Sequence, residues 1–486
     1  MTRLLVMLPF VGAVVALVPQ RAGVRRAVLV AVAALHGAGT VACVAVRPEI
    51  RAGAWLGLDE AGMLVLGISS ALFLAVSIYT VVYLQRQHTP GLHVHEHNES
   101  ERIFCSCLLA FLGTMTLVTA SRHLGLLWVA MEATTLASAP LIYFHRTQRS
   151  LEATWKYVLI CSVGIALALL GTVFLAAGIP AHASPADLTL ERLVASGRMV
   201  QVEWLKISFI CFAVGYGTKV GLAPLHTWLP DAHSEAPSLV SALLSGALLN
   251  CAALGVMRAH QVCVAHETGG FSQDILIVLG IASVIVAAVF IMGQSDYKRM
   301  LAYSSVEHMG IVMLGVGLGG QAVSGALLHA VNHSVTKAAL FMAAGTVLET
   351  CHSKQVEDVR GLRRRLPWTA VIWLAGFFAI TGTPPFGAFI SEYTIAARAL
   401  ESGRWVISVL YLGGLAAIVA GMAKIVIEMT GGVPAQGKAE AREREPAALV
   451  VPPLVLLGVT LVLGVYVPAG LWEFLQRAAA ALGGGL

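Results

Sequence analysis

The sequence predicts an all-α polytopic membrane protein with about 14 transmembrane helices. Three observations predict this fold class. Of the 486 residues, 57% are hydrophobic and only 12% are charged, whereas soluble domains average about 45–50% and about 25%. The mean hydropathy of +0.78 is too high for a water-soluble fold. Nearly uncharged windows of about 20 residues recur from end to end, and each is long enough to cross a hydrocarbon layer about 30 Å thick.

The apolar runs also predict how the chain is oriented in the membrane. An even number of crossings places both termini on one side. Loops on the opposite side carry 18 Lys and Arg residues, against 11 on the side of the termini. Because cytoplasmic loops are enriched in Lys and Arg, we expect both termini on the non-cytoplasmic side. The runs are 4–19, 27–46, 62–84, 103–120, 124–144, 157–177, 207–224, 238–257, 274–292, 300–318, 322–348, 368–390, 405–429 and 449–468.

Two of the predicted helices, the seventh and the twelfth, are interrupted in a related way. The first contains Gly221-Leu-Ala-Pro224-Leu and the second Gly382-Thr-Pro-Pro385-Phe. Helices broken at corresponding places in two halves indicate an inverted-repeat transporter, because unwound backbone is tolerated in a membrane where it lines a cavity. Chance is the alternative, since Gly and Pro are common in membrane helices.

A second similarity between the two halves, Trp128-x-x-x-Glu132 and Tyr303-x-x-x-Glu307, favours the same division into repeats. The predicted units are a three-helix segment at 1–100, a first repeat at 101–260 with helices 4–8, a second repeat at 261–430 with helices 9–13, and a linker with the last helix at 431–486.

Ionisable residues inside these apolar runs are the candidates for function. A charge at mid-membrane costs about 2.5–3.5 kcal/mol on insertion scales, so such residues must face protein, water or one another. They are Glu132, Lys219, Glu307, His308, His329, His333, Lys337, Glu392, Lys424 and Glu428.

His329, His333 and Lys337 recur every four residues and therefore share one face of the eleventh helix, about 6 Å apart per step. This spacing suits proton hopping through intervening water, because histidine exchanges protons near neutral pH. Two histidines at this spacing could also bind a metal. The lysine beside them, and the lack of a Glu after the first His, count against that interpretation. Histidines that simply hydrogen-bond across a helix interface are the structural alternative.

Glu132 lies in the middle of its run, and Lys219 precedes the first helix break. Together they could form a switchable ion pair that gates proton release, or a static buried salt bridge. Lys424 and Glu428, four residues apart, could neutralise each other along one helix face. Glu392, just past Pro385, could be the outlet of the second half or an ordinary interfacial acid.

The remaining motifs predict no cofactor and no metal. His93-Val-His95-Glu-His97 could hold a metal ion, but its setting favours a solvated loop. The eight cysteines contain no C-x-x-C pair, and we find no phosphate-binding glycine loop or nucleophile triad. The net charge of +5 is spread over many loops and does not indicate nucleic-acid binding. We therefore expect no redox or hydrolytic chemistry in this chain.

Three sequence blocks together resemble a known family. The stretch Lys219–Ser238, KVGLAPLHTWLPDAHSEAPS, resembles the signature of the antiporter-like, proton-conducting subunits of respiratory complex I, Mrp antiporters and membrane-bound hydrogenases. KRMLAYSSVEHMG at 298–310 and AVNHSVTKAALF at 330–341 match two further blocks of that family. The resemblance covers roughly residues 100 to 430.

Within the family, the details most resemble hydrogenase-4 component F and the formate hydrogenlyase membrane subunits. The stretches that carry this narrower resemblance are WVAMEATTL at 128–136, SLEATWKYV at 150–158 and SVEH at 305–308. The resemblance implies 14 helices with two inverted five-helix repeats.

The resemblance also implies roles for particular residues. Glu132 and Lys219 would form the first half-channel pair, the eleventh-helix residues the central relay, and Glu392 the end of the second half-channel. One position departs from the family. Complex I subunits commonly carry a lysine or histidine in the eighth helix, where this chain has Asn250, which can hydrogen-bond water but cannot carry a proton's charge.

The function that the resemblance implies is proton translocation in a multisubunit redox complex of the cell membrane. The implied partners are other membrane subunits, lipid, and a peripheral redox arm containing a nickel-iron hydrogenase and iron-sulfur subunits. A subunit of an Mrp-type cation/proton antiporter is one alternative. A structural membrane subunit without transport is the other, and Asn250 favours it.

Overall fold

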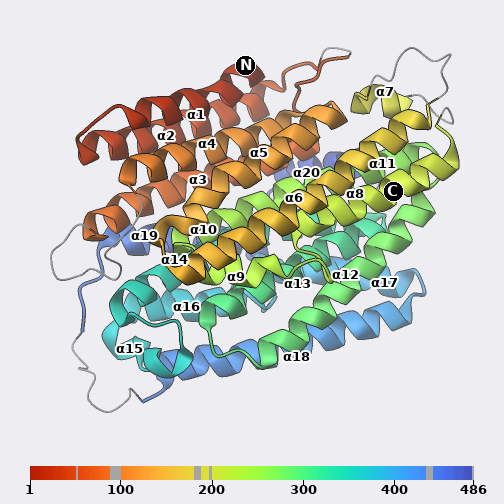
Figure 1. The fold of residues 1–486 in the computed structure, drawn as a ribbon. Helices are drawn as coiled ribbons and strands as arrows, with labels where there is room; N and C mark the ends of the chain where they lie inside the picture. Colours follow the sequence, from red (N-terminus) through yellow and green to blue (C-terminus); the bar gives the residue numbers. More distant parts are fainter. Residues whose placement is uncertain (51–52, 88–99, 180–187, 196–199, 434–441, 484–486) are drawn as a thin grey trace.

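The computed structural model describes all residues except 51–52, 88–99, 180–187, 196–199, 434–441 and 484–486. In these described parts the protein is helical apart from loops and isolated β-bridges. The long helices run alongside one another, with α1 to α5 on one side of the bundle and α18 on the opposite side (Figure 1). The structure therefore confirms the predicted all-α fold class.

The longer helices are α1 (Thr2–Leu17), α2 (Ala22–Val46), α3 (Glu60–Gln87), α4 (Glu101–Ala120), α5 (Leu124–Ile142), α6 (Gln148–Ala177), α8 (Val202–Val220), α11 (Leu249–Ala265), α12 (Gly269–Met292), α13 (Tyr297–Leu318), α14 (Gln321–Cys351), α16 (Pro367–Ile380), α17 (Gly387–Glu401), α18 (Trp405–Gly431), α19 (Ala447–Val465) and α20 (Ala469–Ala481). The short ones are η1 (Tyr143–His145), α7 (Leu190–Ala195), α9 (Trp228–Glu235), α10 (Ser238–Leu243), the π-helical η3 (Leu244–Leu248), η4 (Val356–Val359) and α15 (Leu362–Arg365).

Each predicted apolar run overlaps one helix or several consecutive helical elements. Among the described residues, 10 helices are long and apolar enough to cross a membrane by length and composition alone. α1 and α16 are apolar but shorter, and α14 carries two histidines and a lysine in its middle. The number of 14 crossings and the inverted repeats therefore remain predictions.

Both predicted helix breaks are present in the backbone. α8 ends at Val220, and Gly221 follows with a φ of +80°, a conformation that glycine adopts without steric cost. α16 ends at Ile380, and Gly382 follows with a φ of +62°. The prolines beyond these glycines lack a backbone N–H and so do not continue the helix. Each break leaves backbone groups that protein or water must satisfy inside a membrane.

A third irregularity, the π-helical segment η3, is not marked by any proline. It joins α10 to α11 in the middle of the eighth predicted helix. A Cβ atom on Gly246 would come within 3.0 Å of the Ser334 carbonyl oxygen of α14, so the missing side chain allows the two backbones to approach closely. Such π-bulges often occur at functional sites.

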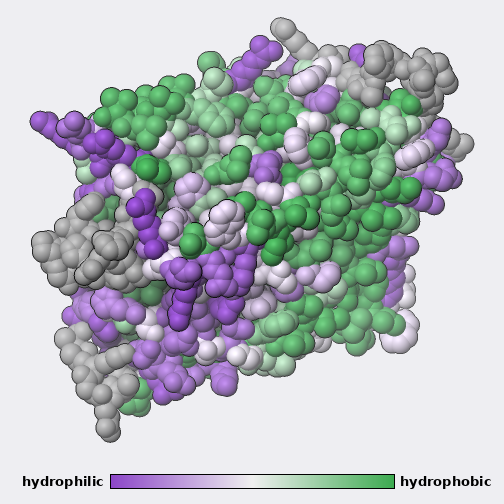
Figure 2. Space-filling model, in the orientation of Figure 1, coloured by the Kyte–Doolittle hydropathy of each residue, from purple (hydrophilic) through white to green (hydrophobic). Residues whose placement is uncertain are grey.

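The most polar helices lie in the interior. In α13, 94% of the membrane-spanning window is buried inside the protein, compared with 33% in α2 and in α18. Figure 2 shows the corresponding outer surface, where hydrophobic side chains cover broad areas and hydrophilic ones gather over α9 and toward one end of the bundle. The outer helices therefore shield the central charges from lipid.

At the opposite end of the bundle from α9, an ion cluster joins the start of α3, the end of α4 with the connection to α5, and α11. Asp59 lies 2.5 Å from Arg122 and 3.3 Å from Arg258. The buried Arg258 guanidinium also donates to the Thr119 carbonyl oxygen at 2.9 Å. Burial raises the pKa of the Asp59 carboxyl, but the charges of Arg258 and Arg122 outweigh it, so this pKa is lowered. The cluster is structural, since it fixes the ends of the helices.

Candidate functional site

Three central helices bring histidines and a carboxylate together. His308 of α13 and His329 of α14 are joined by a hydrogen bond between Nδ1 and Nε2 at 2.8 Å. His329 Nδ1 lies 2.9 Å from the Ser391 hydroxyl of α17. One donor atom from each of His308, His329 and Glu392 lies within 4.8 Å of the other two, and all three residues are buried. The cluster can therefore exchange protons or hold a metal ion.

The hydrogen bonds order the protons in this cluster. Ser391 Oγ donates to the Ala388 carbonyl oxygen at 2.8 Å, so it accepts a hydrogen bond from His329 Nδ1. His329 Nε2 is then an acceptor, and His308 Nδ1–H donates to it. A proton that reaches His308 Nε2 can consequently be passed on, since the Nδ1 proton can move to His329.

The buried histidines do not gather along a single helix face, although His329, His333 and Lys337 are spaced to share one face of α14. The His308 ring lies between the two histidines of α14, with ring centroids 5.0 Å from His329 and 5.1 Å from His333. Neither ring nitrogen of His333 has a hydrogen-bond partner within 3.5 Å, although the Ser245 backbone lies close enough to act on the ring. The Lys337 ammonium donates to the Leu301 carbonyl oxygen of α13 at 2.7 Å. His308, to which the sequence gave only a supporting role, is therefore the histidine that contacts both of the others.

Two carboxylates flank this cluster. Glu307 Oε2 accepts a hydrogen bond from Ser304 at 3.2 Å and lies 3.8 Å from His308 Nε2. Glu392 is only 8% exposed, and its Oε1 has no hydrogen-bond partner. Its other oxygen occupies the space that a side chain on Gly382 would fill. The α16–α17 break therefore accommodates the Glu392 carboxylate.

Lys219 and Glu132 bind different partners. The fully buried Lys219 ammonium donates to the Thr135 hydroxyl, and its distance to the Tyr157 hydroxyl is 3.3 Å. Glu132 accepts a hydrogen bond from Ser162 at 2.7 Å. Within the described residues, Glu132 and Lys219 make no direct ion pair of 4.0 Å or less, so the implied pair is not in contact here.

Glu132 is also less enclosed than Lys219. It is half-buried, and its neighbours on the same helix face, Val129 and Leu136, are 50% and 62% exposed. Part of the Glu132 side chain therefore faces the outer surface of α5, but its Oε2 atom is buried and has no hydrogen-bond partner, whereas Lys219 is fully buried.

Neutral polar groups join η3 and α11 to α13 and α14. Asn250 Nδ2 donates to the Gly246 carbonyl oxygen and to the Ser334 hydroxyl, both at 2.8 Å. The hydroxyls of Ser245 and Ser305 are 2.8 Å apart. All of these side chains are buried. They can hydrogen-bond water but do not titrate, so any proton passing here must be carried by water.

Lys424 and Glu428 do not neutralise each other, although their spacing in the sequence allowed it. Glu428 instead pairs with Arg360, which precedes α15, and the Lys424 side chain is exposed. The reason is that the loop after η4 brings an arginine to the end of α18, where its guanidinium reaches the carboxylate. Neither residue contacts the histidine cluster.

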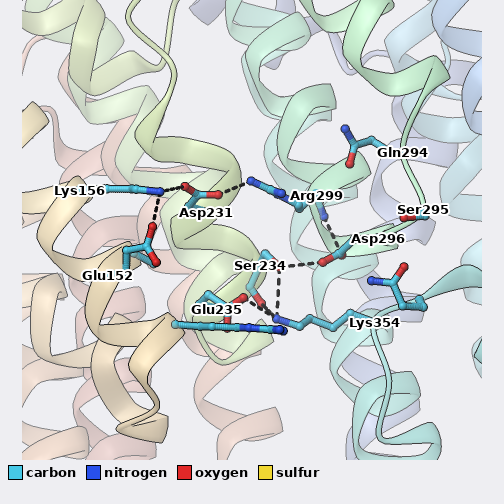
Figure 3. Close-up of a pocket in the computed structure, with 13 residues that line it drawn as sticks. Glu152, Lys156, Asp231, Ser234, Glu235, Gln294, Ser295, Asp296, Arg299 and Lys354 are labelled. Carbon is cyan, nitrogen blue, oxygen red and sulfur yellow. Dashed lines mark hydrogen bonds and ion pairs between the residues drawn. The ribbon is translucent and has the colours of Figure 1, made fainter.

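A charged pocket of about 460 Å³ opens where α6, α9, the α12–α13 loop and the segment after α14 meet. Figure 3 shows its ion pairs: Asp231 bridges Lys156 and Arg299, and Lys354 pairs with Glu235 at 2.7 Å. The buried Lys298 is the neighbour of Arg299 in the first turn of α13. Its ammonium donates to the Ala236 carbonyl oxygen at 2.6 Å.

Sequence reasoning missed the hydroxyl groups of the site. Thr135 and Tyr157 contact Lys219, and Ser391 contacts His329. Two of them could have been suspected from their positions in the sequence, because Ser391 adjoins Glu392 and Thr135 lies one helical turn beyond Glu132. The possible metal ligands at His93, His95 and His97 lie outside the described residues.

The comparisons with known proteins agree with this architecture. Residues 121–418 match the family model described as NADH:quinone oxidoreductase/Mrp antiporter, TM. The hydrogenase-4 component F homolog of Methylacidiphilum infernorum is 33% identical over 433 residues, which cover 88% of this chain and 89% of that protein. The resemblance to the component F group that the sequence indicated is thus confirmed.

Two solved structures share the fold. The archaeal membrane-bound sulfane sulfur reductase matches with a TM-score of 0.86 at 22% identity, covering 99% of this chain and 97% of the other. Respiratory complex I of Thermus thermophilus contains a chain that matches with a TM-score of 0.82 at 24% identity, with both chains fully covered. The extent of the family match and the similarity to the component F homolog lead to one conclusion: this chain belongs to the NADH:quinone oxidoreductase/Mrp antiporter family of transmembrane subunits.

Proposed function

We propose that this chain is a proton-translocating membrane subunit of a multisubunit redox complex of the hydrogenase-4/formate hydrogenlyase type. In this proposal Lys219 stores and releases a proton in the first half under the influence of Glu132. Lys337, His333, His308 and His329 relay protons through the centre. Glu392 ends the path, with Glu307 and Asn250 in support.

The observation that carries the proposal is the buried, directly hydrogen-bonded His308–His329 pair beside Glu392. Titratable groups in a membrane interior are costly, and they persist where they have a function or a partner. A structural cluster would need only satisfied hydrogen bonds. This one leaves Glu392 Oε1, His308 Nε2 and both His333 nitrogens without a hydrogen-bond partner within 3.5 Å, and these are the atoms that a mobile proton or water would use.

The charged pocket is the proposed access from the cytoplasmic side. It is lined by acidic and basic side chains that can hold water, and the fully buried Lys298 lies directly beside it. The proposed orientation, with both termini on the non-cytoplasmic side of the cell membrane, follows from the distribution of Lys and Arg in the loops. Accessibility labelling of the Arg360–Arg365 segment tests this orientation directly.

The proposed partners are other membrane subunits, lipid and a peripheral redox arm. The name of the component F homolog supports a hydrogenase in this arm, and the arm we propose contains a nickel-iron hydrogenase with iron-sulfur subunits. Redox work in this arm would alter the charge state of the Glu132/Lys219 region and so shift protons along the path. Co-purification in mild detergent, followed by nickel analysis, tests the composition of the arm.

Lys219→Ala tests the function itself. In the assembled complex in sealed vesicles, driven by its electron donor, this variant should abolish proton movement measured with a pH-sensitive dye. Lys219→Arg should also abolish it, because an arginine keeps the charge but does not release its proton. Lys206→Ala, at the other end of α8, is the matched control and should pump normally. Normal pumping by either Lys219 variant would refute the proposal.

An Mrp-type cation/proton antiporter subunit is the second candidate, and the family description favours it to the extent that it includes Mrp antiporters. Sodium-dependent transport without any redox partner would support that candidate. A structural subunit without transport is the third candidate, which the neutral Asn250 favours. Ordered water from Lys219 past Asn250 to Lys337 would count against it.

A further inference from the structure

The donor atoms of His308, His329 and Glu392 form a compact three-ligand set within the bundle. They come from three different helices, α13, α14 and α17, and each residue is at least nine-tenths buried. Within the apolar runs, the sequence suggested a metal only at the i, i+4 pair His329 and His333, and the ligand set found here is a different one. It arises because the helix packing brings α13 and α17 against α14.

We propose that His308 Nδ1, His329 Nε2 and a Glu392 carboxylate oxygen bind a Zn²⁺ ion. Given the function proposed above, on which this consequence rests, the bound ion takes the place of the proton shared by the two histidines and stops conduction. Two imidazoles and one carboxylate, with a fourth position for water, are a ligand set that zinc uses in proteins.

The distances support this assignment. Zinc binds histidine nitrogen at about 2.0–2.1 Å, so two nitrogens on a tetrahedral ion lie about 3.3 Å apart. His308 Nδ1 and His329 Nε2 are 2.8 Å apart. The rings therefore need to separate by only about half an ångström. One Glu392 oxygen lies within 4.8 Å of a ring nitrogen of each histidine, and Glu392 Oε1 has no competing hydrogen bond.

His329 already has the kind of outer partner that zinc ligands use, and His308 has a carboxylate near its outer nitrogen but no hydrogen bond to it. A metal-ligating histidine usually donates its other N–H to a hydroxyl, carbonyl or carboxylate group, which fixes the ring. His329 Nδ1 lies 2.9 Å from Ser391 Oγ. His308 Nε2 faces Glu307 Oε2 at 3.8 Å, so in the Nε2–H tautomer it points at a carboxylate. The change needed is a shift of the His308 proton from Nδ1 to Nε2.

Charge balance also favours a divalent ion over a monovalent one. Glu392 binding directly and Glu307 behind His308 provide two negative charges against the two positive charges of zinc, which limits the cost of burying the ion. The Lys337 ammonium also acts on Glu307 and His308 and opposes the ion, so the two carboxylates must offset its charge as well. Sodium prefers oxygen ligands, whereas imidazole nitrogen suits zinc and its neighbours in the transition series. Sodium is therefore a poor match for this ligand set.

Zinc binding can be measured without transport. The purified complex, with His93, His95 and His97 replaced by glutamine to remove a second possible zinc site, is equilibrated with buffered free Zn²⁺, and bound metal is counted. We expect one Zn²⁺ per chain at this site. His329→Gln should remove it, whereas His260→Gln, which replaces a buried histidine of α11 bonded to Ser272, should retain it.

Ser391→Ala is a second test of the site that does not depend on removing a ligand. It keeps all three ligands but removes the outer partner of His329, and loss of such a partner typically weakens metal binding by about 10–100-fold. Binding that is equal in wild type, His329→Gln and Ser391→Ala would overturn the site. So would the absence of any bound Zn²⁺ in the wild type.

Transport then tests the blocking effect separately. In sealed vesicles, Zn²⁺ should inhibit proton movement with half-inhibition at the free concentration that gives half-saturation of the site. Full occupancy with undiminished pumping would overturn the blocking effect, while the site itself would stand. The Lys219→Ala result tests the proposed function without zinc, so failure of the one is distinguishable from failure of the other.

Discussion

Gly382 makes the geometry of the proposed outlet testable. Its φ is +62°, and a Cβ atom there would stand 1.9 Å from Glu392 Oε2. Real Cβ contacts are at least 3.0 Å, so in Gly382→Ala the carboxylate must move by about 1.1 Å. Misplacing reacting groups by about 1 Å can slow a positioned reaction by about 10²-fold. We therefore expect proton movement in sealed vesicles to fall by about that factor.

Backbone strain must be separated from this displacement. An alanine in the left-handed region costs about 1–2 kcal/mol wherever it is placed. Gly403 offers the matched control, because its φ is +69° and nothing lies within 4 Å of the position that a Cβ atom would occupy there. Gly403→Ala should lower the thermal unfolding temperature by a similar amount but leave proton movement intact.

A shorter acid should rescue the defect. In the double variant Gly382→Ala/Glu392→Asp the carboxylate withdraws by one C–C bond, about 1.5 Å, which makes room for the new methyl group. We expect proton movement to recover in part relative to Gly382→Ala. Equal transport by Gly382→Ala and Gly403→Ala would refute the assignment of Glu392 to the outlet.

Three further predictions concern single contacts. Ser391→Ala removes a hydrogen bond worth about 0.5–1.5 kcal/mol, so proton movement should slow by up to about tenfold without loss of assembly, as measured in the same vesicles. Asp59→Asn leaves buried arginine charge unpaired and should lower the free energy of unfolding by about 3–5 kcal/mol, against less than about 1 kcal/mol for the more exposed Glu191→Gln. The pKa of Asp59 is lowered in the folded protein, so Asp59 stabilises the fold at pH values above its unfolded-state pKa, and this stabilisation is lost as pH falls through the folded-state pKa. The acid-unfolding curves of wild type and Asp59→Asn should therefore converge at low pH. Glu428→Gln should leave pumping unchanged, because Glu428 pairs with a surface arginine, and a pumping defect would contradict that placement.

The fold was largely predictable from the sequence. Hydropathy alone locates the helices, because a membrane requires each long apolar run to satisfy its own backbone hydrogen bonds. The glycine–proline pairs at Pro224 and Pro385 likewise located the two breaks in α8–α9 and α16–α17. The π-helical segment η3 could not be predicted, because it depends on the close approach of Gly246 to α14 rather than on a local breaker residue.

The site was predictable only as a set of residue types. Helical spacing correctly placed His329, His333 and Lys337 in one helix, but spacing within a helix says nothing about its neighbours. The link through His308 depends on how α13 packs against α14. The partner of Glu428 similarly depends on a loop distant in sequence. Tertiary packing decides which charges meet.

His308→Gln in the assembled complex tests the central claim most directly. His308 is the residue whose ring contacts both His329 and His333, and glutamine can hydrogen-bond in its place but cannot carry a proton. We predict that electrons still flow from the donor while the vesicles no longer change their internal pH. Undiminished proton movement per electron in this variant would show that protons do not pass through the histidine cluster.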